Sequence, residues 1–147
     1  MKVYRVETYY GIGPYNRTEF KKLIEKDWED EESQGRYKLS QDLHEAHRSQ
    51  GTHPGRYDDF VVHNLFIQNW DNYLCGFLTL EDYKSWFRGF IKRLAKYNFY
   101  VTEYYALQDN IIYGYSLKQL MFKPPTELLR RLHPLTLEEI NGIQCQT

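Results

Sequence analysis

The sequence contains little cysteine, and its cysteines are not arranged as a disulfide framework or a zinc ligand set. Cys75 and Cys145 are the only two in a chain of 147 residues, and no CxxC pair is present. The sequence therefore predicts neither a disulfide scaffold nor a cysteine zinc site, and it favours a reducing compartment.

Long apolar runs and a strong net charge are also missing. No stretch approaches the roughly 18 consecutive apolar residues of a membrane span, and Met1–Arg5 lacks the apolar run of a signal peptide. The formal net charge is -1, so the chain as a whole is not strongly attracted to nucleic acid or membranes. We expect a soluble, intracellular protein whose electrostatic interactions depend on local clusters of charge.

Aromatic residues are abundant, at 17% of the chain, and 14 of them are tyrosines. Tyrosine combines a rigid apolar ring with a polar tip, which is why it is enriched at protein interfaces. One interpretation is a tyrosine-rich contact surface, and the other is ordinary use of tyrosine at half-buried positions. Under the first interpretation, the expected partner-binding anchors are Tyr9, Tyr10, Tyr15 and Tyr37.

The N-terminal third predicts a strand and a helix. Lys2–Thr8 alternates and is rich in β-branched and aromatic residues, and the following Gly11 to Pro14 segment ends the strand. Helical spacing then predicts a helix capped by Thr18 and reaching about Trp28. The C-terminal end of this helix runs into an acidic cluster, where the helix macrodipole disfavours negative charge, so we expect the helix to fray there. The cluster comprises Asp27, Glu29, Asp30, Glu31 and Glu32.

Residues 33–78 give weaker signals. Ser40 is the expected cap of a short helix that carries His44 and His47. The apolar segment 60–67 fits a strand or a helix. The two histidines have the spacing of a shared metal site, but a third ligand is not evident, and solvated histidines are the alternative. We therefore predict no metal site. Cys75 has no activating neighbour in the sequence, so we also predict no catalytic residue.

The strongest pattern predicts one amphipathic helix from Leu80 to Tyr97, with Thr79 as its N-cap and Asp82 three residues later. Its apolar residues share one broad face, and its cations share the opposite face. This basic stripe either binds a partner, such as nucleic acid or an acidic protein groove, or meets the acidic cluster within the fold. The stripe comprises Lys84, Arg88, Lys92, Arg93 and Lys96. Binding of single-stranded nucleic acid would add stacking on Trp86 and Tyr97.

Strands over Tyr100–Ala106 and Ile111–Phe122 predict a late hairpin, with Gly114 as a bulge. Two short capped helices are expected over Thr126–Leu132 and Thr136–Ile140. The predicted fold class is α+β, with a small antiparallel sheet (N-terminal strand plus C-terminal hairpin) packed on a long amphipathic helix and short peripheral helices. Residues 1–122 would form one domain and residues 123–147 a helical extension.

Three residues resemble an ADP-ribosyltransferase arrangement: Arg5 in the first strand, Thr79 before the helix, and Gln119 in the late hairpin. The resemblance implies that Arg5, Thr79 and Gln119 bind a nicotinamide dinucleotide. Gln119 occupies the position of the catalytic glutamate of that family, and an amide cannot supply negative charge to an oxocarbenium-like transition state. The resemblance therefore implies a binder of the dinucleotide, or a weak transferase.

A second resemblance covers more of the chain. Segments from residue 4 to residue 122 are similar to small uncharacterised bacteriophage and prophage proteins: Tyr4-Arg5-Val6-Glu7, Gly11-Ile12-Gly13-Pro14-Tyr15, His53-Pro54, Gly76-Phe77 through Trp86-Phe87, Tyr113-Gly114, Gln119 and Phe122. This resemblance implies a viral accessory protein in a bacterial cytoplasm, without a cofactor, that inhibits a host protein or nucleoprotein complex. A host-defence inhibitor, for example an anti-CRISPR protein, is the expected kind.

Overall fold

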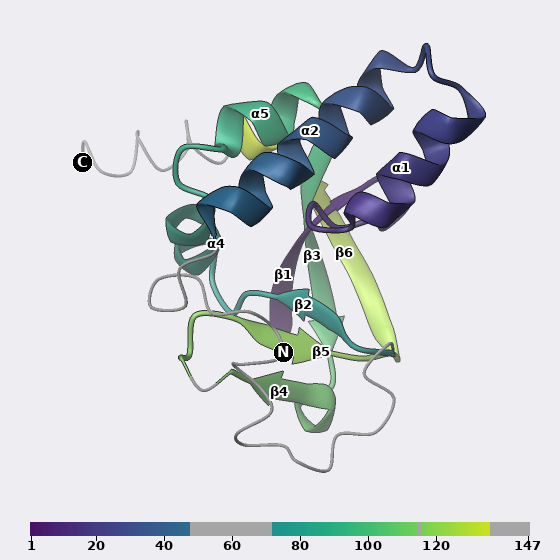
Figure 1. Ribbon diagram of the computed structural model, residues 1–147. Helices are drawn as coiled ribbons and strands as arrows, with labels where there is room; N and C mark the ends of the chain where they lie inside the picture. Colours follow the sequence, from purple (N-terminus) through teal and green to yellow (C-terminus); the bar gives the residue numbers. More distant parts are fainter. Residues whose placement is uncertain (48–71, 115, 136–147) are drawn as a thin grey trace. The chain divides into compact units, whose positions relative to one another are not determined.

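The computed structural model describes residues 1–47, 72–114 and 116–135 (Figure 1). Contacts within the chain divide it into two units. Unit 1 contains the described residues of Met1–Arg5, His47–Arg88 and Thr102–Arg130. Unit 2 contains the described residues of Val6–Ala46, Gly89–Val101 and Arg131–Thr147. The predicted segment 60–67 and the predicted helix Thr136–Ile140 lie outside the described residues.

One sheet has the strand order β1-β3-β6, and each of its strands contributes residues to both units. The strands are β1 (Lys2–Thr8), β3 (Phe99–Ala106) and β6 (Thr126–Leu132). Figure 1 shows them side by side, with β3 between β1 and β6. Met1 and Ala106 exchange two backbone hydrogen bonds of 3.0 and 2.9 Å, the reciprocal pattern of an antiparallel pair. The predicted strand over Lys2–Thr8 is confirmed.

The second sheet, β2-β5-β4, lies within unit 1 and is antiparallel. It consists of β2 (Leu74–Gly76), β4 (Ile111–Tyr113) and β5 (Leu120–Phe122), and the 3-10 helix η2 (Gln108–Asn110) precedes β4. β5 is central and is buried at every position. Its residues join the core cluster of Val3, Ala106, Ile111, Leu120 and Phe122.

Unit 1 also contains α4 (Leu80–Trp86), which begins where the sequence predicts. The Asp82 backbone N–H donates to Thr79 Oγ1 at 3.1 Å, so Thr79 is the N-cap. Rings of this short helix pack with rings that flank it in a cluster of T-shaped and tilted pairs, with centroid separations between 5.8 and 6.5 Å: Phe77, Tyr83, Trp86 and Phe87. T-shaped pairs are favourable for aromatic quadrupoles.

In unit 2, α1 (Arg17–Lys26) packs against α2 (Glu31–Ala46). The predicted cap of α1 is wrong by two residues, because Asn16 Oδ1 accepts from the Glu19 backbone N–H. The predicted end in the acidic cluster is also wrong. α1 stops at Lys26, and Asp30 caps a new helix by accepting from the Ser33 backbone N–H at 3.2 Å and its hydroxyl at 2.7 Å.

The acidic residues therefore lie at the N-terminus of α2, where the macrodipole stabilises negative charge. Ser40 is inside this helix and buried, so it is not the cap of a separate short helix. The buried side of α2 also contains Leu39 and Leu43. Arg36 from the same helix donates to the Tyr97 carbonyl at 2.8 Å, and its guanidinium lies 5.7 Å from the centroid of the Phe99 ring.

The predicted long helix from Leu80 to Tyr97 is wrong. Residues 80–86 form α4 in unit 1, and α5 (Ile91–Lys96) is a separate helix in unit 2. Gly89 lies between them with a φ of +87°, a left-handed conformation that ends a right-handed helix and that glycine adopts without steric cost. The helical spacing of apolar residues continues through this break, which is why the pattern suggested one helix. Asn98, which directly follows the predicted helix, has a φ of +59°.

Two further elements differ from prediction, although the α+β class with antiparallel sheets is confirmed. The hairpin pairs β4 with β5, whereas the strand predicted as its partner, β3, lies between β1 and β6 in the other sheet. Thr126–Leu132 is the strand β6 and not a helix. Its Glu, Leu and Arg residues favour helix locally, but pairing with β3 overrides that weak preference.

Gly89→Ala tests the break between α4 and α5. Alanine at a left-handed position costs about 1–2 kcal/mol, so we expect the free energy of unfolding to fall by about that amount in urea titrations. A more stable variant would contradict the break, because alanine strengthens a continuous helix by about 1 kcal/mol relative to glycine.

Candidate protein-binding surface

A tight turn at the end of β1 presents two adjacent tyrosines in unit 2. The Gly11 N–H donates to the Thr8 carbonyl at 2.9 Å, and Thr8 Oγ1 accepts from the Ile12 N–H at 3.2 Å. Gly11 has a φ of +85°, which favours glycine at this position. Tyr9 and Tyr10 are the central residues of the turn and are 67% and 86% exposed. Their rings meet edge-on with centroids 5.7 Å apart.

Arg131 holds one of these rings in place. Its guanidinium lies 5.1 Å from the centroid of the Tyr9 ring. The same guanidinium forms a 3.2 Å ion pair with Glu7 and donates to the Thr8 carbonyl at 3.3 Å. Glu7 is 1% exposed, so its carboxylate requires a paired cation to remain charged at low cost. Charge, hydrogen bonding and stacking therefore fix Arg131 beneath the turn.

We call this set of residues the tyrosine turn: Tyr9, Tyr10 and Arg131. Tyrosine and arginine are the residue types most enriched among the anchors of protein interfaces. A turn that is already ordered loses little conformational entropy when it binds. The chemistry of this surface therefore suits contact with another macromolecule, and it contains no nucleophile paired with a base.

The other tyrosines predicted as anchors are less exposed. The Tyr15 ring packs 5.6 Å from the His44 ring, and its carbonyl lies 3.0 Å from His44 Nε2. Tyr37 is half-buried on α2. Trp28, near which the predicted helix was expected to end, is 73% exposed. The role of all four tyrosines in binding stays a prediction.

Much of the predicted acidic cluster serves the local fold of unit 2. Hydrogen bonds from Ser33 lower the pKa of Asp30 below its usual range. Asp27 Oδ1 accepts from the Glu29 backbone N–H at 3.1 Å. Glu32 pairs with Arg36 at 3.0 Å and accepts from the Asn98 side-chain amide. Glu29 and Glu31 are exposed.

The predicted basic stripe is not one helix face. Lys84 and Arg88 belong to unit 1, and the remaining cations belong to unit 2. Arg93 forms a 2.8 Å ion pair with Asp42, so its acidic partner is on α2 and not in the cluster of residues 27–32. The hydrogen bond from Arg93 lowers the pKa of Asp42, and Lys38 adds to this effect.

The last two cations of the stripe, Lys92 and Lys96, are exposed, and Lys96 lies over the Tyr97 ring. Trp86 is buried in the aromatic cluster of unit 1, which removes one of the rings that nucleic-acid stacking would need.

Unit 1 contains a second buried carboxylate, that of Glu103, which is 3% exposed. Arg130 pairs with it at 3.2 Å and Lys2 at 3.8 Å. Burial raises the pKa of Glu103, but hydrogen bonds from Arg130 and Tyr4 and the charges of Arg130 and Lys2 outweigh it, so the pKa is lowered overall. Burial, together with the hydrogen bond to this carboxylate, raises the pKa of Tyr4.

Glu103→Gln tests this network. Because the folded pKa of Glu103 is depressed, its contribution is present above the ordinary glutamate pKa and is lost as pH falls through the folded value. We expect the variant to be about 1–3 kcal/mol less stable than wild type at pH 7, with the difference shrinking as pH falls from about 5 towards 2. Urea unfolding over this pH range measures the effect, with exposed Glu25→Gln as control. A difference that does not change with pH would contradict it.

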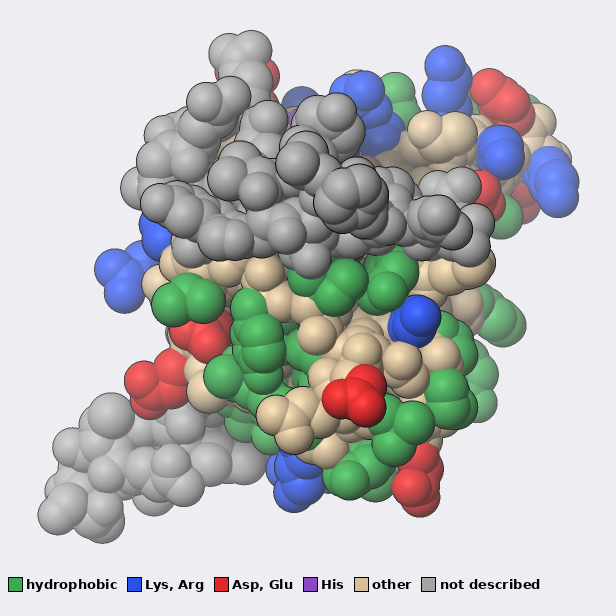
Figure 2. Space-filling view, turned by 90° about the horizontal axis from the view of Figure 1, so that it is seen from below, with side chains coloured by type: hydrophobic (Ala, Val, Ile, Leu, Met, Phe, Trp, Pro, Cys, Tyr) green, Lys and Arg blue, Asp and Glu red, His purple; other side chains and the backbone are tan. Residues whose placement is uncertain are grey.

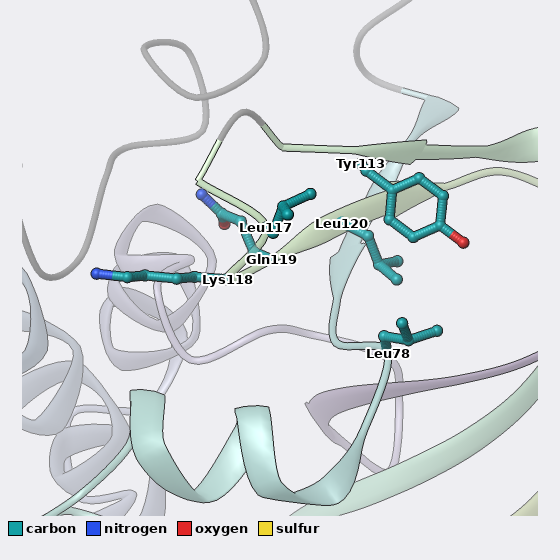
Figure 3. Close-up of a pocket in the computed structure, with 6 residues that line it drawn as sticks. All are labelled: Leu78, Tyr113, Leu117, Lys118, Gln119 and Leu120. Atoms are coloured by element: carbon teal, nitrogen blue, oxygen red, sulfur yellow. The ribbon is translucent and has the colours of Figure 1, made fainter.

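A shallow apolar hollow of about 320 Å³ lies beside the β4–β5 loop in unit 1 (Figure 3). It is lined by Leu78, Tyr113, Leu117, Lys118, Gln119 and Leu120. Leu117 is 74% exposed and has a φ of +60°, a conformation that is strained for leucine. Figure 2 shows hydrophobic side chains gathered on one face of the molecule.

The three residues of the ADP-ribosyltransferase resemblance have structural contacts. Arg5 Nη1 donates to the Cys75 carbonyl at 3.0 Å, and Thr79 caps α4. The backbone carbonyl of Gln119 accepts from Gly114 at 3.0 Å. These contacts give the Arg5 and Thr79 side chains structural roles. Nothing in the described residues supports the resemblance.

The histidine pair does not form a metal site in the described part of the chain. His44 contacts Tyr15, and the His47 ring lies against Trp86 and Phe87. Within the described ranges, no three His, Cys, Asp or Glu side chains are grouped so that they could hold a metal ion. No helix in those ranges has the length and apolar composition needed to cross a bilayer.

Sequence reasoning missed the two arginines of β6. Two residues in the sequence could have indicated them, because Glu7 and Glu103 are each the one acidic residue within a predicted strand. A carboxylate that a strand buries in the core requires a cationic partner. Which cation supplies it depends on strand order, and the sequence does not show that order.

Arg131→Lys separates the charge of Arg131 from its planar shape. Lysine keeps a cation beside Glu7 but loses the flat stack on Tyr9. We expect a loss of about 1 kcal/mol in the free energy of unfolding for Arg131→Lys, and about 3 kcal/mol for Arg131→Met, which leaves a buried carboxylate unpaired. Equal losses in urea titrations would show that the charge beside Glu7 is not needed.

Comparison with known proteins places the chain in a family. No curated protein and no solved structure matches it. The family model of the bacteriophage T4 Y00F protein matches residues 1–135. That match covers both strands that bear the buried carboxylates, the tyrosine turn and β6. The chain therefore belongs to the bacteriophage T4 Y00F protein family.

Proposed function

We propose that this protein is a non-enzymatic phage accessory protein that binds and inhibits a host protein or nucleoprotein complex in the bacterial cytoplasm. The observation that carries the proposal is the tyrosine turn, in which an arginine fixed to a buried carboxylate lies against the exposed Tyr9 ring, and the exposed Tyr10 ring meets Tyr9 edge-on. Membership of a phage protein family supports a role during infection. A host-defence complex is the kind of target that we propose.

The tyrosine turn is favoured over the two charged regions because its side chains project from an ordered backbone. In the acidic cluster, Asp30 caps α2 and Glu32 forms an ion pair with Arg36. The cations of the basic stripe are divided between the two units. Exposed charges contribute mainly to the rate of encounter, whereas buried aromatic anchors contribute most of the affinity. The exposed Lys92 and Lys96 would then steer approach without setting specificity.

Capture from a bacterial lysate tests the proposal. The immobilised full chain is compared with Tyr9→Ala/Tyr10→Ala, and bound proteins are identified by mass spectrometry. If truncation of each tyrosine costs about 2 kcal/mol of binding free energy, the double variant binds its partner up to about a thousandfold more weakly. We expect the amount of captured protein to fall at least about thirtyfold, which corresponds to the loss of one anchor.

Tyr105→Ala is the matched control, because Tyr105 is 47% exposed and lies in unit 1. It should retain the partner. Equal retention by all three chains would contradict the tyrosine turn as the anchor, and absence of any specific partner at low salt would contradict the binding function itself. Nuclease treatment of the lysate distinguishes the two partner classes, since a partner bound through nucleic acid is lost.

A further inference from the structure

In unit 1, one face of the β1-β3-β6 sheet gathers two cations around one carboxylate. The three strands lie side by side with β3 in the middle, and Glu103 belongs to β3 (Figure 1). From β6, Arg130 Nη2 lies 3.2 Å from Glu103 Oε2. From β1, Lys2 Nζ lies 3.8 Å from Glu103 Oε1, and the Tyr4 hydroxyl also donates to this carboxylate. We call these four residues the Glu103 cluster.

The Glu103 cluster is open to solvent and has a surplus of positive charge. The side chains of Lys2 and Arg130 are 61% and 57% exposed, whereas Glu103 is buried. Side chains alternate between the two faces of a strand, so Leu128 shares the face of Arg130, and it is 46% exposed. By the same alternation, the described residues of unit 1 on this face of the three strands include no second acid. Two cations therefore share one carboxylate, which leaves one positive charge.

Both cations retain N–H donors for a second anion. A guanidinium has five donors in a planar fork, and the contact from Arg130 to Glu103 uses one of them. This contact also limits the motion of the Arg130 side chain, which lowers the entropic cost of binding another carboxylate. Lys2 has three donors, and its 3.8 Å separation from Glu103 is longer than a hydrogen bond. An anion that approaches from solvent can therefore accept from Lys2 and Arg130.

We propose that the Glu103 cluster binds a carboxylate of an acidic protein segment, and that an apolar residue of the same segment packs on Leu128. A carboxylate matches the planar fork of a guanidinium, and charge-assisted hydrogen bonds are about twice as strong as neutral ones. Two cations beside an exposed leucine suit a protein segment better than a nucleic acid, whose affinity grows with the number of phosphates that are neutralised. This surface is separate from the tyrosine turn, which lies in unit 2, and does not depend on it.

NMR titration of the isotope-labelled full chain tests the site. The probe is a terminally blocked peptide of alternating glutamate and leucine, and the same peptide with glutamine in place of glutamate is the neutral control. We expect the glutamate peptide to shift the amide signals of Lys2, Glu103 and Arg130, and to bind at least about tenfold more tightly than the control at low salt. Equal binding of the two peptides, or no binding of the glutamate peptide at millimolar concentration, would overturn the proposal.

Lys2→Gln and Lys21→Gln are the matched variants. Lys2→Gln removes one cation of the cluster, but Arg130 keeps Glu103 paired, so we expect the variant to fold. Its affinity for the glutamate peptide should fall by about threefold. Lys21→Gln makes the same charge change at an exposed site on α1 in unit 2 and should bind as wild type does.

Two results with these chains would contradict the proposal. Wild-type affinity in Lys2→Gln would show that the cluster does not hold the carboxylate. Tighter binding of single-stranded DNA that carries the same charge as the glutamate peptide would assign this surface to nucleic acid instead.

Discussion

The structure depends on two carboxylates buried in neighbouring strands. Glu7 of β1 and Glu103 of β3 are 1% and 3% exposed, and each is paired with an arginine of β6. A buried carboxylate without a partner costs several kcal/mol, so β6 must supply its guanidinium groups at these positions. Arg130 and Arg131 are consecutive, and the alternation of a strand sends them to different faces. This requirement explains why a segment with helical preferences forms a strand.

The same pairing connects the fold to the candidate surface. Arg131 neutralises Glu7 and also lies against the Tyr9 ring, so the interaction that stabilises unit 2 orders the exposed turn. In unit 1, Arg130 neutralises Glu103 and stays accessible at the edge of β6. Each arginine therefore combines a structural contact with one that faces outward. Surfaces built in this way are ordered before a partner arrives, which lowers the entropic cost of binding.

The sequence predicted local features well and long-range features poorly. Alternation identified β1, and capping chemistry identified Thr79 as the N-cap of α4. The long helix failed because periodicity describes side chains and does not report the left-handed backbone at Gly89. The acidic cluster was assigned to the wrong helix end because Asp30 was not recognised as a cap. Strand order, and hence the partners of Glu7 and Glu103, is a long-range property that no local pattern contains.

Hydrogen–deuterium exchange of the full chain, free and with the host protein that it captures, tests the central claim most directly. The tyrosine turn as anchor predicts slower amide exchange over Thr8–Ile12 in the complex, with Ile91–Lys96 unchanged. Slower exchange confined to Ile91–Lys96 or to the acidic cluster, with Thr8–Ile12 unaffected, would contradict it.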